Sequence, residues 1–255
     1  MITVGIDVGS ITAKSAVVKD GKVISHKLIM TGYNARNAGE KVFGSVIKDL
    51  GLKASSIDKI ISTGYGRNSV TIAHKAVTEI TCHAKGAHYL DPAIRSVIDI
   101  GGQDSKAIVV SDVGRVKDFA MNDKCAAGTG RFLEVMARAL EVDLNDFGEF
   151  SLNADKPSNI SSLCTVFAES EVISLISNGE KRMNIIAGIH ESIAARVVAM
   201  AGRVGLETPI MMTGGVAKNI GVVKALERKT GKKIAVSPEA QITGAIGAAL
   251  IGQRA

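Results

Sequence analysis

The sequence is poor in aromatic residues and contains no tryptophan. Aromatic side chains make up 4% of its 255 residues. Proteins that hold single-stranded nucleic acid stack bases on such side chains, so we do not expect this function. No stretch approaches the roughly 20 apolar residues that span a bilayer, and no signal peptide precedes the first apolar segment. We therefore expect a cytoplasmic protein that binds neither nucleic acid nor membrane.

Cysteine is also scarce, and the number is odd. The chain has three cysteines, Cys82, Cys125 and Cys164, and no Cys-x-x-Cys pair. An odd count in a chain without a secretion signal argues against a disulfide framework and directs attention to metal binding or chemistry. Cys82, which is followed by a histidine, is predicted to be structural, because neighbouring side chains on a helix point in different directions.

Charge is distributed rather than concentrated. The net charge of +6 comes from Lys and Arg residues dispersed along the chain. Such a surface is typical of ordinary solvation, and a docking face for an acidic protein or an acyl-CoA is the alternative. The hydrophobic fraction of 46% is ordinary for a globular protein with a substantial core.

The most informative feature is an internal repeat. Ile6-Asp-Val-Gly-Ser10 recurs 92 residues later as Ile98-Asp-Ile-Gly-Gly102. At the same offset, Lys14-Ser-Ala-Val-Val18 recurs as Lys106-Ala-Ile-Val-Val110. Each copy combines β-branched runs with glycine-containing turns, a pattern that predicts three consecutive strands. The repeat therefore indicates two similar α/β lobes, which we place at residues 1–94 and 95–255.

Later segments have clearer helical or strand patterns. Apolar spacing predicts helices after Gly130 and over residues 182–204, and a small-residue helix over residues 243–251. A buried strand is predicted over residues 209–213, ending at a glycine pair, Gly214 and Gly215.

Each repeated turn places an aspartate at the end of a strand and a glycine just after it. Small residues let backbone amides approach phosphate oxygens, and a carboxylate can hold Mg²⁺ through water. A single Asp-x-Gly is usually only a turn, but two in equal register, Asp7 and Asp99, predict that both lobes face one nucleotide.

Three segments carry a resemblance to a superfamily. Gly5-Ile-Asp-Val-Gly-Ser-Ile-Thr12, Asp99-Ile-Gly-Gly-Gln-Asp104 and Met212-Thr-Gly-Gly-Val-Ala217 resemble the phosphate-1, phosphate-2 and adenosine motifs of the acetate kinase/sugar kinase/Hsp70/actin superfamily. The resemblance implies two ribonuclease-H-like lobes around ATP or ADP, Mg²⁺ positioned by Asp7 and Asp99, and an attacking water oriented by Gln103 or Asp104. It also implies a set of nucleotide-binding residues: Ser10, Ile11, Thr12, Ala13, Lys14, Gly101, Gly102, Gln103, Gly214, Gly215 and Gln241.

Two cysteines precede segments that we expect to be helical, Cys125 before the helix at Gly130 and Cys164 before an apolar stretch. Helix N-termini stabilise thiolates and negatively charged clusters. A 4Fe–4S cluster takes four thiolates, so a cluster held by these two alone would need a second chain. Taken by spacing alone, both are more typical of buried apolar cysteines.

A second resemblance favours cluster ligands over buried apolar residues as the role of these two cysteines. Thr63-Gly-Tyr-Gly-Arg-Asn68, Asn122-Asp-Lys-Cys-Ala-Ala-Gly-Thr-Gly-Arg-Phe132 and Cys164-Thr-Val-Phe-Ala-Glu-Ser-Glu171 closely resemble the activator component of (R)-2-hydroxyacyl-CoA dehydratases, in the benzoyl-CoA reductase/2-hydroxyglutaryl-CoA dehydratase activator family. This resemblance implies a homodimer that shares one 4Fe–4S cluster, ligated by Cys125 and Cys164 of each chain. It also implies an oxygen-sensitive ATPase that accepts electrons from ferredoxin or flavodoxin and passes them to a dehydratase component.

Three other functions fit parts of the sequence. A small-molecule kinase would share the ATP motifs, but kinases of this superfamily usually carry insertions for which 255 residues leave little room. In a nucleotide-dependent clamp, the cysteines would be buried residues of the core with no chemical role. The ATPase subunit of a benzoyl-CoA reductase would need a second, non-identical ATPase. The acyl-CoA substrate is not readable from the sequence, because its pocket would belong to the partner.

Overall fold

The computed structural model describes residues 1–161 and 164–254. Its first sheet has the strand order β3-β2-β1-β4-β5. The strands are β1 (Ile2–Val8), β2 (Thr12–Lys19), β3 (Lys22–Met30), β4 (Lys59–Thr63) and β5 (Lys75–Ala76). The second sheet has the order β10-β9-β6-β7-β8, with strands β6 (Ser96–Ile100), β7 (Ser105–Val110), β8 (Val116–Asn122), β9 (Ile210–Thr213) and β10 (Ile234–Val236).

The two sheets repeat one arrangement, as the internal repeat predicts. In each, three consecutive antiparallel strands are extended by a parallel strand beside the first: β4 beside β1 and β9 beside β6. Asp7 pairs with Lys14 in the first sheet, and Asp99 pairs with Lys106 at the same place in the second. The first strands, β1 and β6, are buried along nearly their whole length and are mostly apolar, with Thr3 and Ser96 as buried polar residues besides these aspartates.

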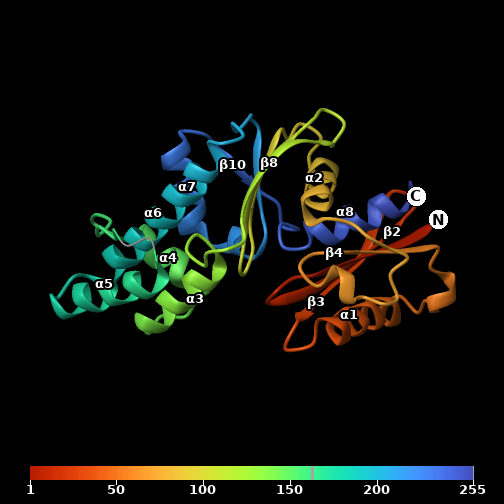
Figure 1. Ribbon diagram of the computed structural model, residues 1–255, viewed down its shortest axis with the longest axis horizontal. Coiled ribbons are helices and arrows are strands. Elements are labelled where there is room, and N and C mark those ends of the chain that lie inside the picture. Colours follow the sequence, from red (N-terminus) through yellow and green to blue (C-terminus); the bar gives the residue numbers. More distant parts are fainter. Residues whose placement is uncertain (162–163, 255) are drawn as a thin grey trace.

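Helices cover both sheets and separate into two groups (Figure 1). On the first lobe lies α1 (Ala35–Asp49), whose N-terminus is capped by the side chain of Asn34. Most of the helices belong to the second lobe: α3 (Gly130–Ala139), α4 (Phe147–Leu152), α5 (Thr165–Ser177), α6 (Arg182–Ala201) and α7 (Ile220–Thr230). The predicted helix at residues 182–204 is thus three residues shorter at its C-terminal end. The predicted helix after Gly130 and the strand at residues 209–213 are also present.

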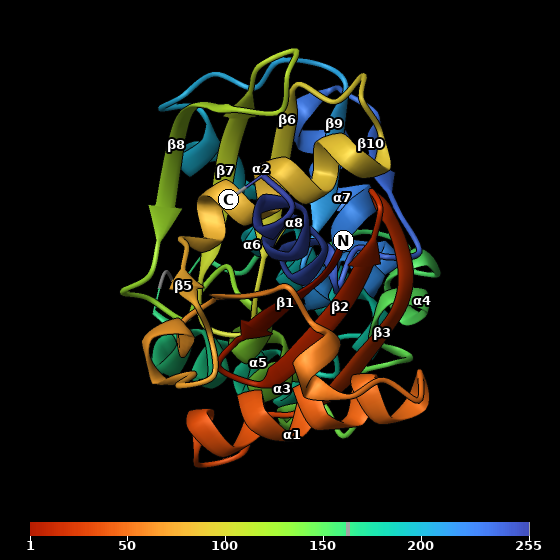
Figure 2. The ribbon, with the colours of Figure 1, turned by 90° about the vertical axis from the view of Figure 1, so that its right-hand side faces the viewer.

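Two helices lie between the sheets, α2 (Glu79–Leu90) and α8 (Thr243–Gly252), side by side in the centre of the molecule (Figure 2). Although α8 ends the chain, it packs on β1, β2 and β4 of the first sheet. Its small residues permit this approach: a Cβ atom on Gly5 of β1 would lie 2.0 Å from the Ala245 carbonyl oxygen. The division at residues 94 and 95 stays a prediction, and α8 crosses it.

Within the described residues, no helix has the length and hydropathy needed to cross a membrane.

Candidate nucleotide cleft and thiol site

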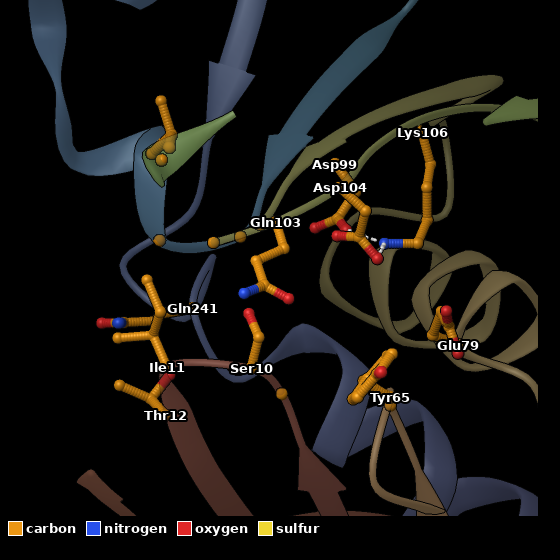
Figure 3. A pocket seen from close by; sticks show the side chains of 18 of the residues that line it. Ser10, Ile11, Thr12, Tyr65, Glu79, Asp99, Gln103, Asp104, Lys106 and Gln241 are labelled. Atoms are coloured by element: carbon orange, nitrogen blue, oxygen red, sulfur yellow. Dashed lines mark hydrogen bonds and ion pairs between the residues drawn. The ribbon is translucent and has the colours of Figure 1, made fainter. Parts of the chain in front are cut away.

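A cavity of about 900 Å³ lies where the glycine turns of the two lobes meet. Three turns line it: the β1–β2 turn, the β6–β7 turn and the turn after β9. The cavity therefore brings the three predicted motifs together (Figure 3). Of the residues predicted to bind nucleotide, the cavity is lined by Ser10, Ile11, Thr12, Lys14, Gly101, Gly102, Gln103, Gly214, Gly215 and Gln241.

Ala13 is the exception among these predictions. Its side chain is fully buried in the hydrophobic core of the first lobe and is not part of the cavity lining. The reason is the alternation of side chains along β2, which turns Thr12 and Lys14 toward the cavity and Ala13 away from it.

Each lobe supplies an aspartate and a lysine from facing positions of its first hairpin. Lys14 Nζ lies 3.5 Å from Asp7 Oδ2, and Lys106 Nζ lies 3.1 Å from Asp99 Oδ2. All four side chains line the same cavity, so the internal repeat places two carboxylate–ammonium pairs around one ligand site.

Asp99 is the better-anchored carboxylate. It accepts hydrogen bonds from Thr213 Oγ1 at 2.9 Å and from Lys106 Nζ, and His83 Nδ1 lies 3.4 Å away. Burial by itself would raise the pKa of Asp99, but the charges of His83 and Lys106 and the Thr213 hydrogen bond outweigh it and hold the pKa well below its ordinary value. Asp99 is therefore a fixed negative charge at the floor of the cavity.

Lys106 also binds Asp104, with Nζ at 2.9 Å from Asp104 Oδ2. Burial would lower the pKa of Lys106, but its two carboxylate partners raise it. Burial raises the pKa of Asp104, against the attraction of Lys106. Gln103 is exposed, and its side chain points toward Ser10, whereas Asp104 turns toward Lys106 (Figure 3). Of the two residues predicted to orient water, Gln103 is thus the one whose side chain is not engaged by a cation.

The chemistry of the cleft fits a magnesium nucleotide. Gly214 has φ +88°, and a Cβ atom there would lie 2.3 Å from the Ile100 carbonyl oxygen, so this turn admits only glycine beside the cavity. Asp7 and Asp99 are buried carboxylates in opposite walls. Within residues 1–161 and 164–254, no three His, Cys, Asp or Glu residues gather to enclose a metal. Mg²⁺ in this cleft would be held by few carboxylates with water and phosphate oxygens, which is its usual coordination.

The thiols differ in exposure. Cys82 is fully buried in α2, and burial raises its pKa to about 12, which agrees with the predicted structural role. Cys125 is half-buried, and Cys164 is exposed at the N-cap of α5. The helices that follow them, α3 and α5, contact each other. Two residues of the motif around Cys164, 162 and 163, lie outside the described part of the chain.

Cys125 is not next to a helix N-terminus, contrary to the sequence-based expectation. Four residues separate it from the start of α3 at Gly130. The positive charge near its sulfur comes instead from α6, because Arg196 Nη1 lies 3.8 Å from Cys125 Sγ. Of these two cysteines, only Cys164 is at a helix N-terminus that could stabilise its thiolate.

Among the cleft and thiol-site residues that the sequence reasoning missed are His83, Lys106 and Arg196. For Lys106 a signal existed, since both repeats place a lysine seven residues after the aspartate. His83 and Arg196 come from helices distant in sequence from their partners, and nothing in the local pattern marks them.

Together, the duplicated sheets and the shared cleft define a nucleotide-binding protein of the sugar kinase and actin type. A ROK family glucokinase from Streptomyces griseus has this fold, with a TM-score of 0.64 at 11% identity over 100% of both chains. Residues 4–252 match the BadF/BadG/BcrA/BcrD ATPase family. The chain belongs to this family.

Individual relatives are similar along their whole length. An activator of lactoyl-CoA dehydratase from Anaerotignum propionicum is 49% identical over an alignment of 256 positions that covers 100% of this chain and 98% of the relative. The structure of component A of the Acidaminococcus fermentans (R)-2-hydroxyglutaryl-CoA dehydratase has a TM-score of 0.96 at 47% identity, over 100% of this chain and 98% of that one. An activator of the 2-hydroxyisocaproyl-CoA dehydratase from Clostridium difficile, with bound ADPNP, has a TM-score of 0.93 at 43% identity, over 99% and 94%. The predicted family resemblance and fold class are confirmed.

Proposed function

We propose that this ATPase is the activator of an (R)-2-hydroxyacyl-CoA dehydratase, working as a homodimer that shares one 4Fe–4S cluster. The proposal rests chiefly on the number and exposure of its thiols. Only Cys125 and Cys164 are accessible, and they precede two helices in mutual contact. Since a 4Fe–4S cluster takes four thiolates, two chains contributing this pair complete the ligand set on a two-fold axis.

The surface around Cys164 supports the dimer. Val166 and Phe167, in the first turn of α5, are 67% and 68% exposed, and Ile173 further along is 53% exposed. Large apolar side chains gathered on one exposed helix are typical of a protein interface. A second copy, whose Cys164 must reach the same cluster, is the partner that would cover them.

The cleft supports ATP binding and hydrolysis. Lys14 and Lys106 place positive charge opposite the phosphates, and the turns at Gly101 and Gly214 allow backbone amides to approach them. Asp7 and Asp99 would hold Mg²⁺, which would neutralise charge on the phosphate oxygens. Gln103 would orient the attacking water, while Asp104 would stay paired with Lys106.

The cluster would carry one electron from a ferredoxin or flavodoxin to the dehydratase component. Those donors are acidic partners of the kind that a chain with net charge +6 attracts. The acyl-CoA would bind to the dehydratase rather than to this chain.

Anaerobic purification tests the proposal. We expect a brown dimer with about four irons and an equal amount of sulfide, and ATP-dependent activation of a purified dehydratase by catalytic amounts of this protein. Exposure to air should bleach the protein and abolish activation. Iron-free protein that still activates the dehydratase fully would contradict the cluster assignment.

A further inference from the structure

The nucleotide cleft is hydrogen-bonded directly to the helix that follows the Cys125 loop. The backbone N–H groups of Gly130 and Arg131 donate to the carbonyl oxygens of Gly101 and Gly102, each at 2.8 Å. The first N–H groups of a helix have no partner within it and need an acceptor elsewhere. Here the acceptors are the carbonyls of the β6–β7 turn, which lines the cavity.

Gly130 is at a point of close contact on this path. A Cβ atom there would lie 3.1 Å from the Gly101 carbonyl oxygen, 3.4 Å from Gly102 Cα and 3.4 Å from Val216 Cγ2. The start of α3 therefore touches the β6–β7 turn and the segment after β9, both of which line the cavity. The tightest of these contacts is with the Gly101 carbonyl oxygen, so an alanine here would require that carbonyl or the start of α3 to shift by a few tenths of an ångström.

The other face of the β6–β7 turn contacts the first lobe. A Cβ atom on Gly102 would lie 2.6 Å from Ile11 Cδ1 and 2.9 Å from Ser10 Oγ. Gly102 thus lies between the β1–β2 turn on one side and the N–H group of Arg131 on the other. A change in the separation of the lobes, or a phosphate entering between their turns, must act on Gly102.

On the far side of Gly130, the Cys125 loop is held together by its own bonds. Asn122 Nδ2 donates to the carbonyl oxygens of Cys125 at 2.9 Å and Ala127 at 3.3 Å. Thr129 Oγ1 donates to the Ala126 carbonyl oxygen at 2.5 Å. With so many internal hydrogen bonds, residues 122–129 will move as one body with the start of α3 rather than absorb its movement.

We infer that Gly130 is the positioning residue through which the nucleotide cleft controls Cys125. The path runs from the Ser10–Ile11 turn through Gly102 and Gly101 to the N–H groups of Gly130 and Arg131, and then to the Cys125 loop. Its role in electron transfer rests on the proposed function, but the mechanical link concerns the chain alone and can be tested without a cluster.

The test compares Gly130→Ala with Gly44→Ala, both in a Cys164→Ser chain purified without iron. Gly44 lies in the exposed face of α1, where a Cβ atom meets nothing within 4 Å. Because Cys82 is buried, a thiol reagent reports on Cys125. Saturating ADPNP should change the labelling rate of Cys125 by about fivefold or more in the Gly44→Ala chain, as for an ordinary coupling between sites. In the Gly130→Ala chain the ratio of rates with and without ADPNP should fall to about one.

The ratio of the labelling rates with and without saturating ADPNP distinguishes a lost coupling between the cleft and Cys125 from a general loss of stability. A destabilised Gly130→Ala chain would label faster with and without ADPNP and would keep the ratio, which would overturn the inference. So would a Gly44→Ala chain that shows no response to ADPNP. Hydrogen exchange of the unaltered protein provides a second measurement that does not require Gly130→Ala to fold. ADPNP should slow exchange in a peptide covering residues 125–135. Unchanged exchange in this peptide would also overturn the inference. The proposed cluster is tested separately, by iron analysis of the unaltered protein, so that failure of one proposal is distinguishable from failure of the other.

Discussion

Arg196 Nη1 lies 3.8 Å from Cys125 Sγ, although the two residues are far apart in the sequence. If Cys125 ligates the proposed cluster, a guanidinium group beside its sulfur stabilises added negative charge and so favours the reduced form. We therefore expect Arg196→Met to lower the reduction potential of the proposed cluster, measured by anaerobic titration followed by electron paramagnetic resonance. Arg203→Met, an exposed position past the end of α6, is the control. Equal potentials in the two variants would show that Arg196 has no electrostatic role.

Replacing Cys125 or Cys164 by serine should abolish the proposed cluster and leave nucleotide binding intact, because neither thiol lines the cavity. Iron content and ADPNP affinity, measured on the same anaerobic preparations, check both parts of this expectation. Cys82→Ala is the matched control and should keep its iron, since Cys82 is buried in α2. A full complement of iron in either serine variant would make the ligand assignment wrong.

Phe167→Glu should convert the proposed dimer to a monomer, because it places a charge in the apolar face of α5. Burying an unpaired carboxylate at an interface is strongly unfavourable. Sedimentation equilibrium measures the change directly. Val113→Glu alters another exposed apolar residue, 56% accessible and in the β7–β8 hairpin, and should leave the dimer unchanged. A dimeric Phe167→Glu protein would place the interface elsewhere.

Lys106→Met should reduce the free energy of unfolding by about 3 kcal/mol, the cost of leaving buried carboxylates without their cation. Asp99 is almost fully buried, and the Lys106 ammonium group lies 3.1 Å from its carboxylate and 2.9 Å from that of Asp104. Because the chain lacks tryptophan, urea unfolding is best followed by circular dichroism. Lys117→Met removes a solvent-exposed pair with Glu207 and should cost less than about 1 kcal/mol. Similar losses in the two variants would contradict the proposed anchoring of Asp99.

His190 should make the protein sensitive to mild acid. Burial, and to a smaller extent Arg228, lower its pKa from 6.5 to about 3. Below about pH 6.5 the unfolded chain binds a proton that the folded chain does not, so stability falls with falling pH until the folded pKa is reached. Between pH 6.5 and about pH 5 this amounts to about 1.6 kcal/mol.

Urea midpoints at these two pH values test this expectation. His190→Gln should remove most of the pH dependence, whereas His26→Gln, exposed on β3, should retain it. If His190→Gln and His26→Gln lose the same stability on acidification, another group is responsible.

Local patterns predicted much of the architecture because the decisive signals are short-range. An aspartate at the end of an apolar strand and glycines in the turn specify each hairpin, and repetition of this pattern indicated two related lobes. Nearly all of the residues predicted from these motifs to bind nucleotide line the cavity. Ala13 is the exception, because membership in a turn does not say which face of the following strand a side chain occupies.

Contacts between distant elements could not be predicted in this way. The small residues of α8 indicated close packing, yet only the folded chain shows that they pack on the first sheet and on α2. Likewise, His83 reaches Asp99 because α2 lies between the sheets.

The sequence by itself determined the duplicated hairpins and predicted that Asp7 and Asp99 face one cavity. Only the tertiary structure decided that Lys106 bridges Asp99 and Asp104, that Arg196 lies beside Cys125, and that Gly130 links the cleft to the thiol loop. The physical reason is that hydrogen-bonded turns depend on a few neighbouring residues. Contacts between helices and turns depend instead on how the whole apolar core packs.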